Sequence, residues 1–177
     1  MKRNILVFGA IALASAISGI YFSASKITPA ASSAAALSPV VAQLFKQSLP
    51  DSNGKEQPLA QFQGKALVLN FWATWCAPCV QEMPELSGLQ AELTPKDVQL
   101  LGIGIDSPSN IAEFATKYKI AYPLYVAGMS GTELSRQLGN AAGGLPFTVL
   151  IGRDGQVKKT YLGRLKLAEL RGDIASM

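Results

Sequence analysis

The stretch of sequence that decides the fold reads Leu67-Val68-Leu69-Asn70-Phe71-Trp72-Ala73-Thr74-Trp75-Cys76-Ala77-Pro78-Cys79. Its first half, with Ala66 before it, is a nearly continuous apolar run bounded by Gly64-Lys65, which is typical of a strand buried on both faces. A helix is expected to follow from about Pro78 to Leu93, because proline is tolerated in the first helical turn, and Pro84 should kink it. Both cysteines therefore lie where a buried strand gives way to a helix.

Strands and helices alternate through the rest of the chain. The patterns predict strands over 98–105, 124–126, 147–151 and 156–161, and helices over 110–118, 132–138 and 166–175. A hairpin is expected around 48–55, with Asn53-Gly54 as its turn. Together these elements predict an α/β fold in which a central mixed sheet is flanked by helices.

The composition excludes several kinds of site. The chain has 177 residues, two cysteines and no histidine. It therefore cannot carry a Ser-His-Asp triad, a Cys-His protease pair or a histidine-bearing zinc site, and one chain cannot supply four thiolates to a metal. The chain has sixteen Lys and Arg and twelve Asp and Glu, a net charge of +4. Lys2 and Arg3 are the only charged residues before Lys26, so the net charge of residues 26–177 is 14 − 12 = +2. We expect no metal and no nucleic-acid partner.

The first 25 residues predict a membrane-directed segment. Residues 5–22 carry no charge and would span roughly 27 Å as a helix. Lys2 and Arg3 place the N-terminal end in the cytoplasm, so the rest of the chain is exported. A signal peptide cut after Ser23-Ala24-Ser25 remains an alternative, but we favour an uncleaved anchor, because signal peptides usually have an apolar core of about 7–15 residues.

A tether and one domain are expected after this segment. Residues 26–43 are rich in Ala, Ser and Pro, which predicts a flexible linker. Residues 44–177 should form the domain, since about 100–200 residues is the usual domain length.

The close spacing of Cys76 and Cys79 favours redox chemistry over a structural role. Loop closure predicts roughly 2 kcal/mol for so small a ring, against about 4.7 kcal/mol for a loop of 100 residues. Half of a shared zinc site would need a second chain. A pair this close is better suited to opening and closing than to stabilising a fold.

The two cysteines are expected to have different roles. The free N–H groups and positive dipole end of the following helix should stabilise a thiolate at Cys76, which is therefore the predicted nucleophile. Cys79 lies one helical turn inward and can attack the mixed disulfide to release the substrate. Ala77 and Pro78 separate the pair and are expected to contact the substrate, and Pro78 removes one backbone donor from the loop.

At these residues the chain resembles the thioredoxin superfamily, and specifically the membrane-anchored or exported proteins of the TlpA and ResA type. The resemblance covers about residues 44–175. It is carried by 67–79, Glu82-Met83-Pro84, an insertion after Ile105, and Gly144-Leu145-Pro146-Phe147-Thr148. It implies a thioredoxin-like fold with an N-terminal hairpin and a βα insertion.

The resemblance also implies roles for particular residues. Asn70 stands where thioredoxins proper have a buried proton-shuttling Asp, and an amide cannot shuttle a proton. In the ResA-like proteins a glutamate at the position of Glu82 is thought to be the acid/base beside the cysteines, so we expect Glu82 to be partly buried with a raised pKa. Pro146 should be cis and lie against the cysteine pair, with Leu145 offering its backbone to a substrate strand.

We interpret the two tryptophans differently. Trp75 is expected to be a partly exposed platform beside Cys76, where a substrate could rest. Trp72 is expected to pack in the core.

The expected activity is thiol-disulfide exchange in the periplasm, by a domain held at a bacterial inner membrane through residues 5–22. The resemblance favours a reductase, with apocytochrome c cysteines or copper-site cysteines as candidate substrates and a membrane thiol donor of the DsbD or CcdA kind. A thiol oxidase of the same fold is the alternative direction. No cofactor is expected besides the Cys76–Cys79 disulfide itself.

Two other functions of related folds fit less well. A copper chaperone of the Sco type uses C-x-x-x-C and a distant histidine, whereas this chain has a shorter spacing and no histidine. A peroxidase would need a Pro-x-x-x-Thr-x-x-Cys setting, which the residues before Cys76 do not provide.

Overall fold

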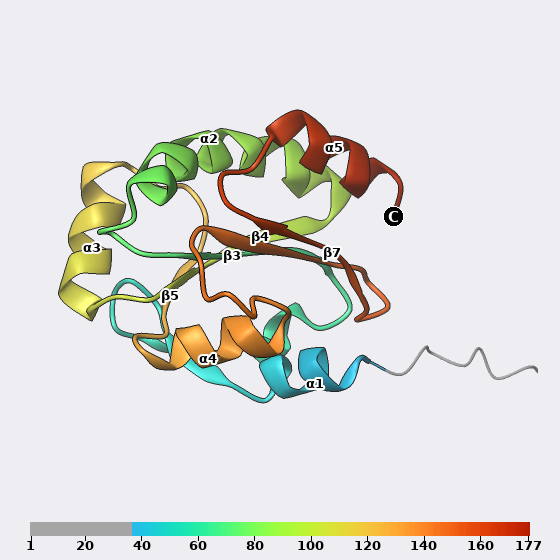
Figure 1. The fold of residues 1–177 in the computed structure, drawn as a ribbon, viewed down its shortest axis with the longest axis horizontal. Coiled ribbons are helices and arrows are strands. Elements are labelled where there is room, and N and C mark those ends of the chain that lie inside the picture. The colour runs from blue at the N-terminus through green and yellow to red at the C-terminus, as the bar shows by residue number, and fades with distance from the viewer. Residues whose placement is uncertain (1–36) are drawn as a thin grey trace, which may run out of the picture. The chain divides into compact units, whose positions relative to one another are not determined.

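A five-stranded mixed sheet forms the centre of residues 37–177, the part of the chain that the computed structural model describes (Figure 1). In spatial order the strands are β5 (Leu124–Val126), β4 (Val98–Gly104), β3 (Ala66–Trp72), β6 (Phe147–Ile151) and β7 (Val157–Leu162). β3, β4 and β5 run parallel, while β6 is antiparallel to β3 and β7 is antiparallel to β6. The predicted mixed sheet is confirmed.

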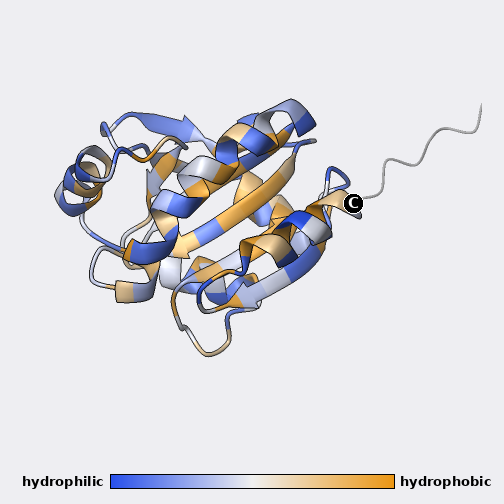
Figure 2. Cartoon of the chain, turned by 90° about the horizontal axis from the view of Figure 1, so that it is seen from above, coloured by the Kyte–Doolittle hydropathy of each residue, from blue (hydrophilic) through white to orange (hydrophobic). Residues whose placement is uncertain are grey.

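Helices cover both faces of this sheet (Figure 1). One face carries α2 (Ala77–Leu93), α3 (Pro108–Lys117) and α5 (Leu167–Ala175), and the other carries α1 (Pro39–Phe45) and α4 (Ser130–Gln137). Two short 3-10 turns, η1 (Leu59–Phe62) and η2 (Thr94–Lys96), lie in the connections. Each face has its own apolar core, and the central strands between them are the most hydrophobic elements (Figure 2).

The central position of β3 explains its apolar sequence. All seven residues of the strand are buried, because β4 and β6 pair with its edges and helices cover its faces. Side chains alternate between the two cores, so that Asn70 and Trp72 face α2 while Phe71 faces α1 and α4. Asn70 is thereby the polar residue that β3 turns towards α2.

The N-terminal hairpin is also confirmed. β1 (Ser48–Pro50) pairs with β2 (Glu56–Pro58) in antiparallel register. The turn is wider than an Asn-Gly pair would make, since Gly54 has a positive φ of 82° and Asn53 does not. Asp51 organises the turn instead, because its Oδ1 accepts the backbone N–H groups of Asn53 and Lys55.

The predicted linker 26–43 is wrong over its last residues. α1 begins at Pro39, and Val41 is fully buried. The Ser38 hydroxyl caps this helix by accepting the N–H of Val41, and the Ser38 N–H donates to Gly155. The domain therefore starts before residue 44, because a short capped helix places its few apolar side chains against the sheet.

Other helix boundaries differ by one or two residues from the predicted ones. α3 begins at Pro108, since the Ser107 side chain accepts the N–H of Asn110 and so fixes the first turn. α2 runs on through Pro84 without interruption. Within residues 37–177 no helix has the length and apolar character needed to cross a membrane. The predicted span at 5–22 lies outside the described residues.

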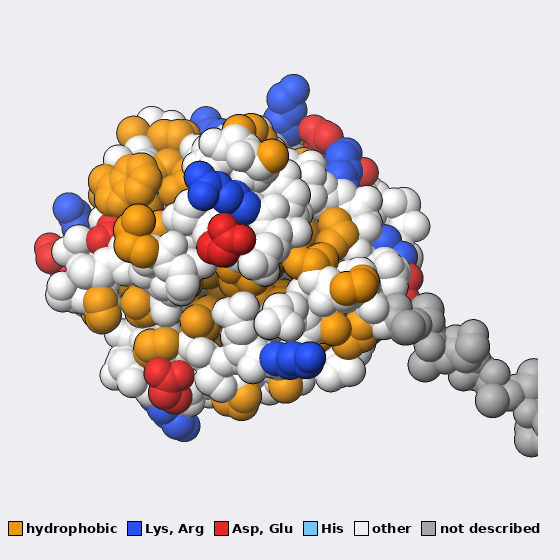
Figure 3. All heavy atoms as spheres, turned by 60° about the horizontal axis from the view of Figure 1, so that its bottom comes forward, with side chains coloured by type: hydrophobic (Ala, Val, Ile, Leu, Met, Phe, Trp, Pro, Cys, Tyr) orange, Lys and Arg blue, Asp and Glu red, His pale blue; other side chains and the backbone are white. Residues whose placement is uncertain are grey.

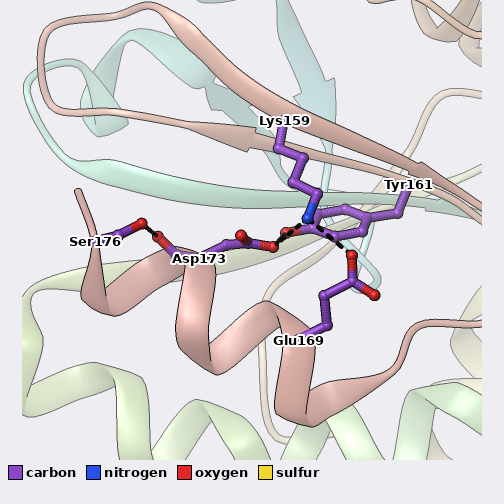
Figure 4. A network of polar contacts seen from close by, with 5 residues as sticks. All are labelled: Lys159, Tyr161, Glu169, Asp173 and Ser176. Carbon is purple, nitrogen blue, oxygen red and sulfur yellow. Dashed lines mark hydrogen bonds and ion pairs between the residues drawn. The ribbon is translucent and has the colours of Figure 1, made fainter.

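α5 is attached to the edge strand β7 by a small polar network (Figure 4). Lys159 on β7 forms ion pairs with Glu169 and Asp173 of α5, at 2.8 and 2.7 Å. The Tyr161 hydroxyl donates to the same Asp173 carboxylate at 2.6 Å. These contacts hold α5 over the sheet face that also carries α2.

Candidate active site

Cys76 and Cys79 are joined by a disulfide at the start of α2. Cys76 is the N-cap residue of the helix, and its sulfur accepts the N–H of Cys79 at 3.3 Å. The cysteine turn follows β3 and lies at the end of the sheet. The apolar run of β3 predicts this position, because it indicates a buried strand directly before the cysteines. The sulfur of Cys76 thus lies where free helical N–H groups can stabilise a thiolate.

The two sulfurs differ in their access to solvent. Cys76 is 6% exposed, whereas Cys79 is fully buried. Ala77 and Pro78 between them are exposed. A large disulfide partner can therefore approach from the Cys76 side, while Cys79 faces the core beneath it.

The two tryptophans occupy the positions expected for them. Trp75 is 70% exposed directly before Cys76. Trp72 is fully buried and packs against Phe114 of α3, with ring centroids 4.7 Å apart. Trp75 is thus free to contact another molecule, whereas Trp72 belongs to the core.

The Leu145–Pro146 peptide bond is cis, as the resemblance implied. Phe147, the next residue, pairs with Phe71 near the end of β3, so Pro146 lies at the sheet end from which the cysteine turn emerges. Pro146 is buried and Leu145 is half-buried. Leu145 packs against the core cluster that contains both cysteines.

Glu82 is more deeply buried than the sequence predicts, with no exposed surface. Its Oε1 accepts the side-chain N–H of Asn70 at 2.8 Å, and its Oε2 accepts the backbone N–H of Leu165 at 2.6 Å. Burial raises the pKa of Glu82, against the opposing effect of these two hydrogen bonds and of Arg164. A carboxyl group that can take up a proton therefore lies one helical turn from Cys79.

A row of three residues crosses the sheet beneath Glu82. Thr148 of β6, Asn70 of β3 and Gly102 of β4 are register partners on neighbouring strands. Gly102 has no side chain to offer, and a Cβ there would lie 3.1 Å from the ring of Tyr122 and 3.2 Å from Trp72 Nε1. The absence of a side chain leaves room for these two aromatic groups beside Asn70.

Tyr122 adds a second buried ionisable group near Glu82. Its hydroxyl has no hydrogen-bond partner among the described residues. Burial holds the pKa of Tyr122 well above its ordinary value, and the Glu82 charge raises it further. Tyr122 is therefore a neutral phenol at this buried position, and no sequence pattern singles it out.

Asp106 is a further site residue that the sequence analysis missed. Its carboxylate accepts hydrogen bonds from the backbone N–H and the hydroxyl of Thr74, two residues before Cys76. Asn110 and the Ser107 N–H donate to the other oxygen. A polar residue directly after a buried parallel strand is the signal that could have found it, since such strands end at the same edge as β3.

Several apolar side chains line the surface beside Trp75, the residue that precedes Cys76. A groove of about 520 Å³ beside Trp75 is lined by Ile105, Val126, Ala127 and Met129, with Met129 83% exposed. Leu162, 60% exposed, covers Gly144 next to the cis-proline. Figure 3 shows one face of the molecule, on which apolar side chains form several patches among charged ones. Such a surface is suited to contact with another polypeptide.

Comparison with known proteins agrees with this geometry. The Redoxin family profile matches residues 24–174. The chain is 32% identical over 132 residues to the thiol-disulfide oxidoreductase ResA of Geobacillus thermodenitrificans, which covers 73% of this chain and 72% of the relative.

Solved structures share the fold. A thiol:disulfide interchange protein of the thioredoxin family from Chlorobium tepidum is 27% identical, with a TM-score of 0.63, over 73% of this chain and 91% of that one. A secreted Mycobacterium tuberculosis disulfide oxidoreductase homologous to E. coli DsbE has a TM-score of 0.64 at 23% identity, over 76% of this chain and 98% of that one.

Proposed function

Because this chain belongs to the Redoxin family and is a thiol-disulfide oxidoreductase of the ResA type, we propose that it reduces disulfides in other proteins in the periplasm. The carrying observation is the asymmetry of the cysteine pair. Cys76 lies at a helix N-terminus beneath an apolar surface, and Cys79 is buried one turn from Glu82. This arrangement suits one sulfur to attack and the other to resolve.

The first step uses Cys76. In the reduced protein its thiolate attacks one sulfur of the substrate disulfide, forming a Cys76–substrate bond as the substrate S–S bond breaks. The other substrate sulfur leaves as a thiolate. The N–H of Cys79, which points at Cys76 in the oxidised protein, stabilises the attacking sulfur.

The second step uses Cys79. Its thiol transfers a proton towards the Glu82 carboxylate and attacks the sulfur of Cys76, which forms the disulfide described above and releases the second substrate thiolate. Two electrons pass from the cysteine pair to the substrate. A membrane thiol donor of the DsbD or CcdA kind would return them, with residues 5–22 holding the domain at the inner membrane.

Protein substrates suit the surroundings of Cys76 better than small thiols do. Trp75, Met129 and Leu162 are large, apolar and exposed close to the disulfide and the cis-proline. Cysteines of apocytochrome c before haem attachment are one candidate substrate, and cysteines of a copper site are another.

A trapping experiment tests the exchange and the nucleophile together. Expressed in its native compartment, Cys79→Ala should accumulate mixed disulfides between Cys76 and its substrates, which can be identified by mass spectrometry. Cys76→Ala serves as the matched control. Adducts on Cys79 in the control, with none on Cys76 in the first variant, would reverse the assignment.

The direction of electron flow is tested separately by the reduction potential. A value near that of thioredoxin, about −270 mV, is expected for a reductant. A value near that of DsbA, about −120 mV, would instead make the protein a thiol oxidase.

A further inference from the structure

We propose that Asn70 is a positioning residue that holds the Glu82 carboxylate in place through a buried hydrogen bond, and that Thr148 orients Asn70 for this task. The proposal rests on the proposed function in one respect, namely that Glu82 exchanges a proton with Cys79. It concerns a residue that makes no contact with the substrate and acts through Glu82.

Both carboxylate oxygens of Glu82 accept hydrogen bonds from buried donors. One carboxylate oxygen accepts from Asn70 Nδ2 at 2.8 Å and the other from the Leu165 N–H at 2.6 Å. Asn70 Nδ2 also donates to Thr148 Oγ1 at 3.0 Å. Asn70, Glu82 and Thr148 are all fully buried, so no solvent competes with these contacts. The amide has donors for both neighbours, and the two bonds fix its plane.

The orientation of the Asn70 amide suits the charged form of Glu82. Nδ2 donates to the carboxylate, whereas Oδ1 could accept the O–H of the carboxylic acid if the amide turned over. Turning the amide would place the N–H groups of Nδ2 where Oδ1 now lies, and Oδ1 has no hydrogen-bond partner among the described residues. The observed orientation is therefore favoured, because the turned amide would bury unsatisfied donors. The Thr148 hydroxyl accepts from Nδ2 and so supports the orientation in which this nitrogen also faces Glu82.

The same geometry links the proton site to the proline strand. Asn70 and Thr148 are register partners on β3 and β6, and Thr148 lies two residues after the cis Pro146. Asn70 therefore joins the helix that carries the cysteines to the strand that begins at the proline. Thr148 thus orients the Asn70 amide, and the amide positions the Glu82 carboxylate.

Charged and titratable groups approach Glu82 from three parts of the chain. Arg164 lies in the connection before α5 and favours the carboxylate, whereas Glu85 on α2 disfavours it. Tyr122 faces Glu82 from the segment before β5, and Cys79 lies one turn away on α2. Since burial raises the pKa of Glu82 and Asn70 lowers it, loss of the Asn70 donor should favour the protonated form.

The experiment measures the Glu82 pKa directly, by carbon-13 NMR titration of its side-chain carboxyl in the oxidised full-length protein. The Glu82→Gln variant identifies the signal. Asn70→Leu should move the titration midpoint upward by about one pH unit, the size expected for a hydrogen bond to a charged group. Thr148→Val should move it in the same direction by less, and Thr148→Ser should restore it.

The exchange rate with a small aromatic disulfide provides the second measurement. Its pH profile should shift with Asn70→Leu and Thr148→Val, but neither substitution should shift it in a Glu82→Gln background, because both act through that carboxyl. Thr160→Val, at an exposed threonine of β7, is the matched control.

Unchanged midpoints in both variants, or equal profile shifts with and without Glu82, would overturn the positioning role. Thr148→Val is nearly isosteric, so it keeps the test valid if Asn70→Leu fails to fold. Because the small disulfide needs no protein partner, this result is independent of the trapping experiment that tests the proposed function.

Discussion

The carboxylate of Asp106, two residues after the end of β4, accepts both the backbone N–H and the hydroxyl of Thr74, which directly precedes Trp75 and Cys76. This contact fixes the turn that leads from β3 to the cysteines. Asp106→Ala should lower the free energy of unfolding by about 1–2 kcal/mol, since it removes charge-assisted hydrogen bonds at a half-buried site. Urea denaturation at neutral pH measures the loss.

The contribution of Asp106 to the free energy of unfolding should also depend on pH. Burial opposes ionisation of Asp106, but hydrogen bonds from Thr74, Asn110 and Ser107 outweigh it and lower the pKa. A carboxyl whose pKa is lowered by folding stabilises above its unfolded pKa and loses that contribution as pH falls. The difference between wild type and Asp106→Ala should therefore shrink below about pH 4. A difference that grew in acid would contradict this explanation.

Gly102 should tolerate no side chain. A Cβ there would lie 2.5 Å from Leu124 Cδ2 and against the rings of Tyr122 and Trp72. We expect Gly102→Ala to destabilise the protein by about 1–3 kcal/mol through overpacking. Gly88→Ala is the matched control, because that glycine lies within α2 with nothing near its Cβ position, and the change should stabilise by about 0.5–1 kcal/mol. Equal effects of the two substitutions would argue against a packing cause.

Trp75 should matter for protein substrates and hardly at all for small ones. Trp75→Ala is expected to lower kcat/KM for a protein disulfide roughly tenfold, as loss of an aromatic contact at an interface does. The rate with a small aromatic disulfide should stay within about twofold. Met177→Ala is the control, because Met177 is exposed and apolar but lies with Ala66 and Val98 at the opposite end of the sheet. A similar loss with both substrates would place Trp75 in the chemistry instead.

Glu82 should make the oxidised fold less stable as pH rises. Burial raises the Glu82 pKa, so above the ordinary glutamate pKa of about 4.3 the folded state binds more protons than the unfolded one. The stability of wild type relative to Glu82→Gln should fall as pH increases from about 4.3 through the raised folded pKa. Urea titrations at several pH values measure this difference. A constant difference across that range would mean that burial does not shift the group.

Much of the fold could be predicted from the sequence because its main signals are local. The buried strand 66–72 was visible as an apolar run, and the cysteine turn followed from the strand and the proline. α1 was missed because its apolar positions are few and its composition resembles a linker. Its burial depends on the sheet and on contacts such as the Ser38–Gly155 hydrogen bond, which no local pattern encodes.

The site was predicted as far as side-chain type and spacing allow. Glu82 was expected from the resemblance to ResA-like proteins, but no sequence pattern points to the Leu165 N–H that binds the same carboxylate 83 positions along the chain. A backbone donor has no sequence signature. The roles of Thr148 and Tyr122 could not be predicted for a related reason. Their closeness to Glu82 comes from strand register and from the absence of a side chain at Gly102.

The alternating exposure of β7 has a consequence for solubility. This strand is an open edge of the sheet, where unpaired backbone groups could recruit another chain. Lys158 and Thr160 project outward from it, and an irregular register between Leu150 and Ile151 interrupts its pairing with β6. Charge and irregularity of this kind discourage edge-to-edge aggregation. The open edge of the sheet is thereby protected against self-association, even though large apolar side chains such as Trp75 and Met129 are exposed.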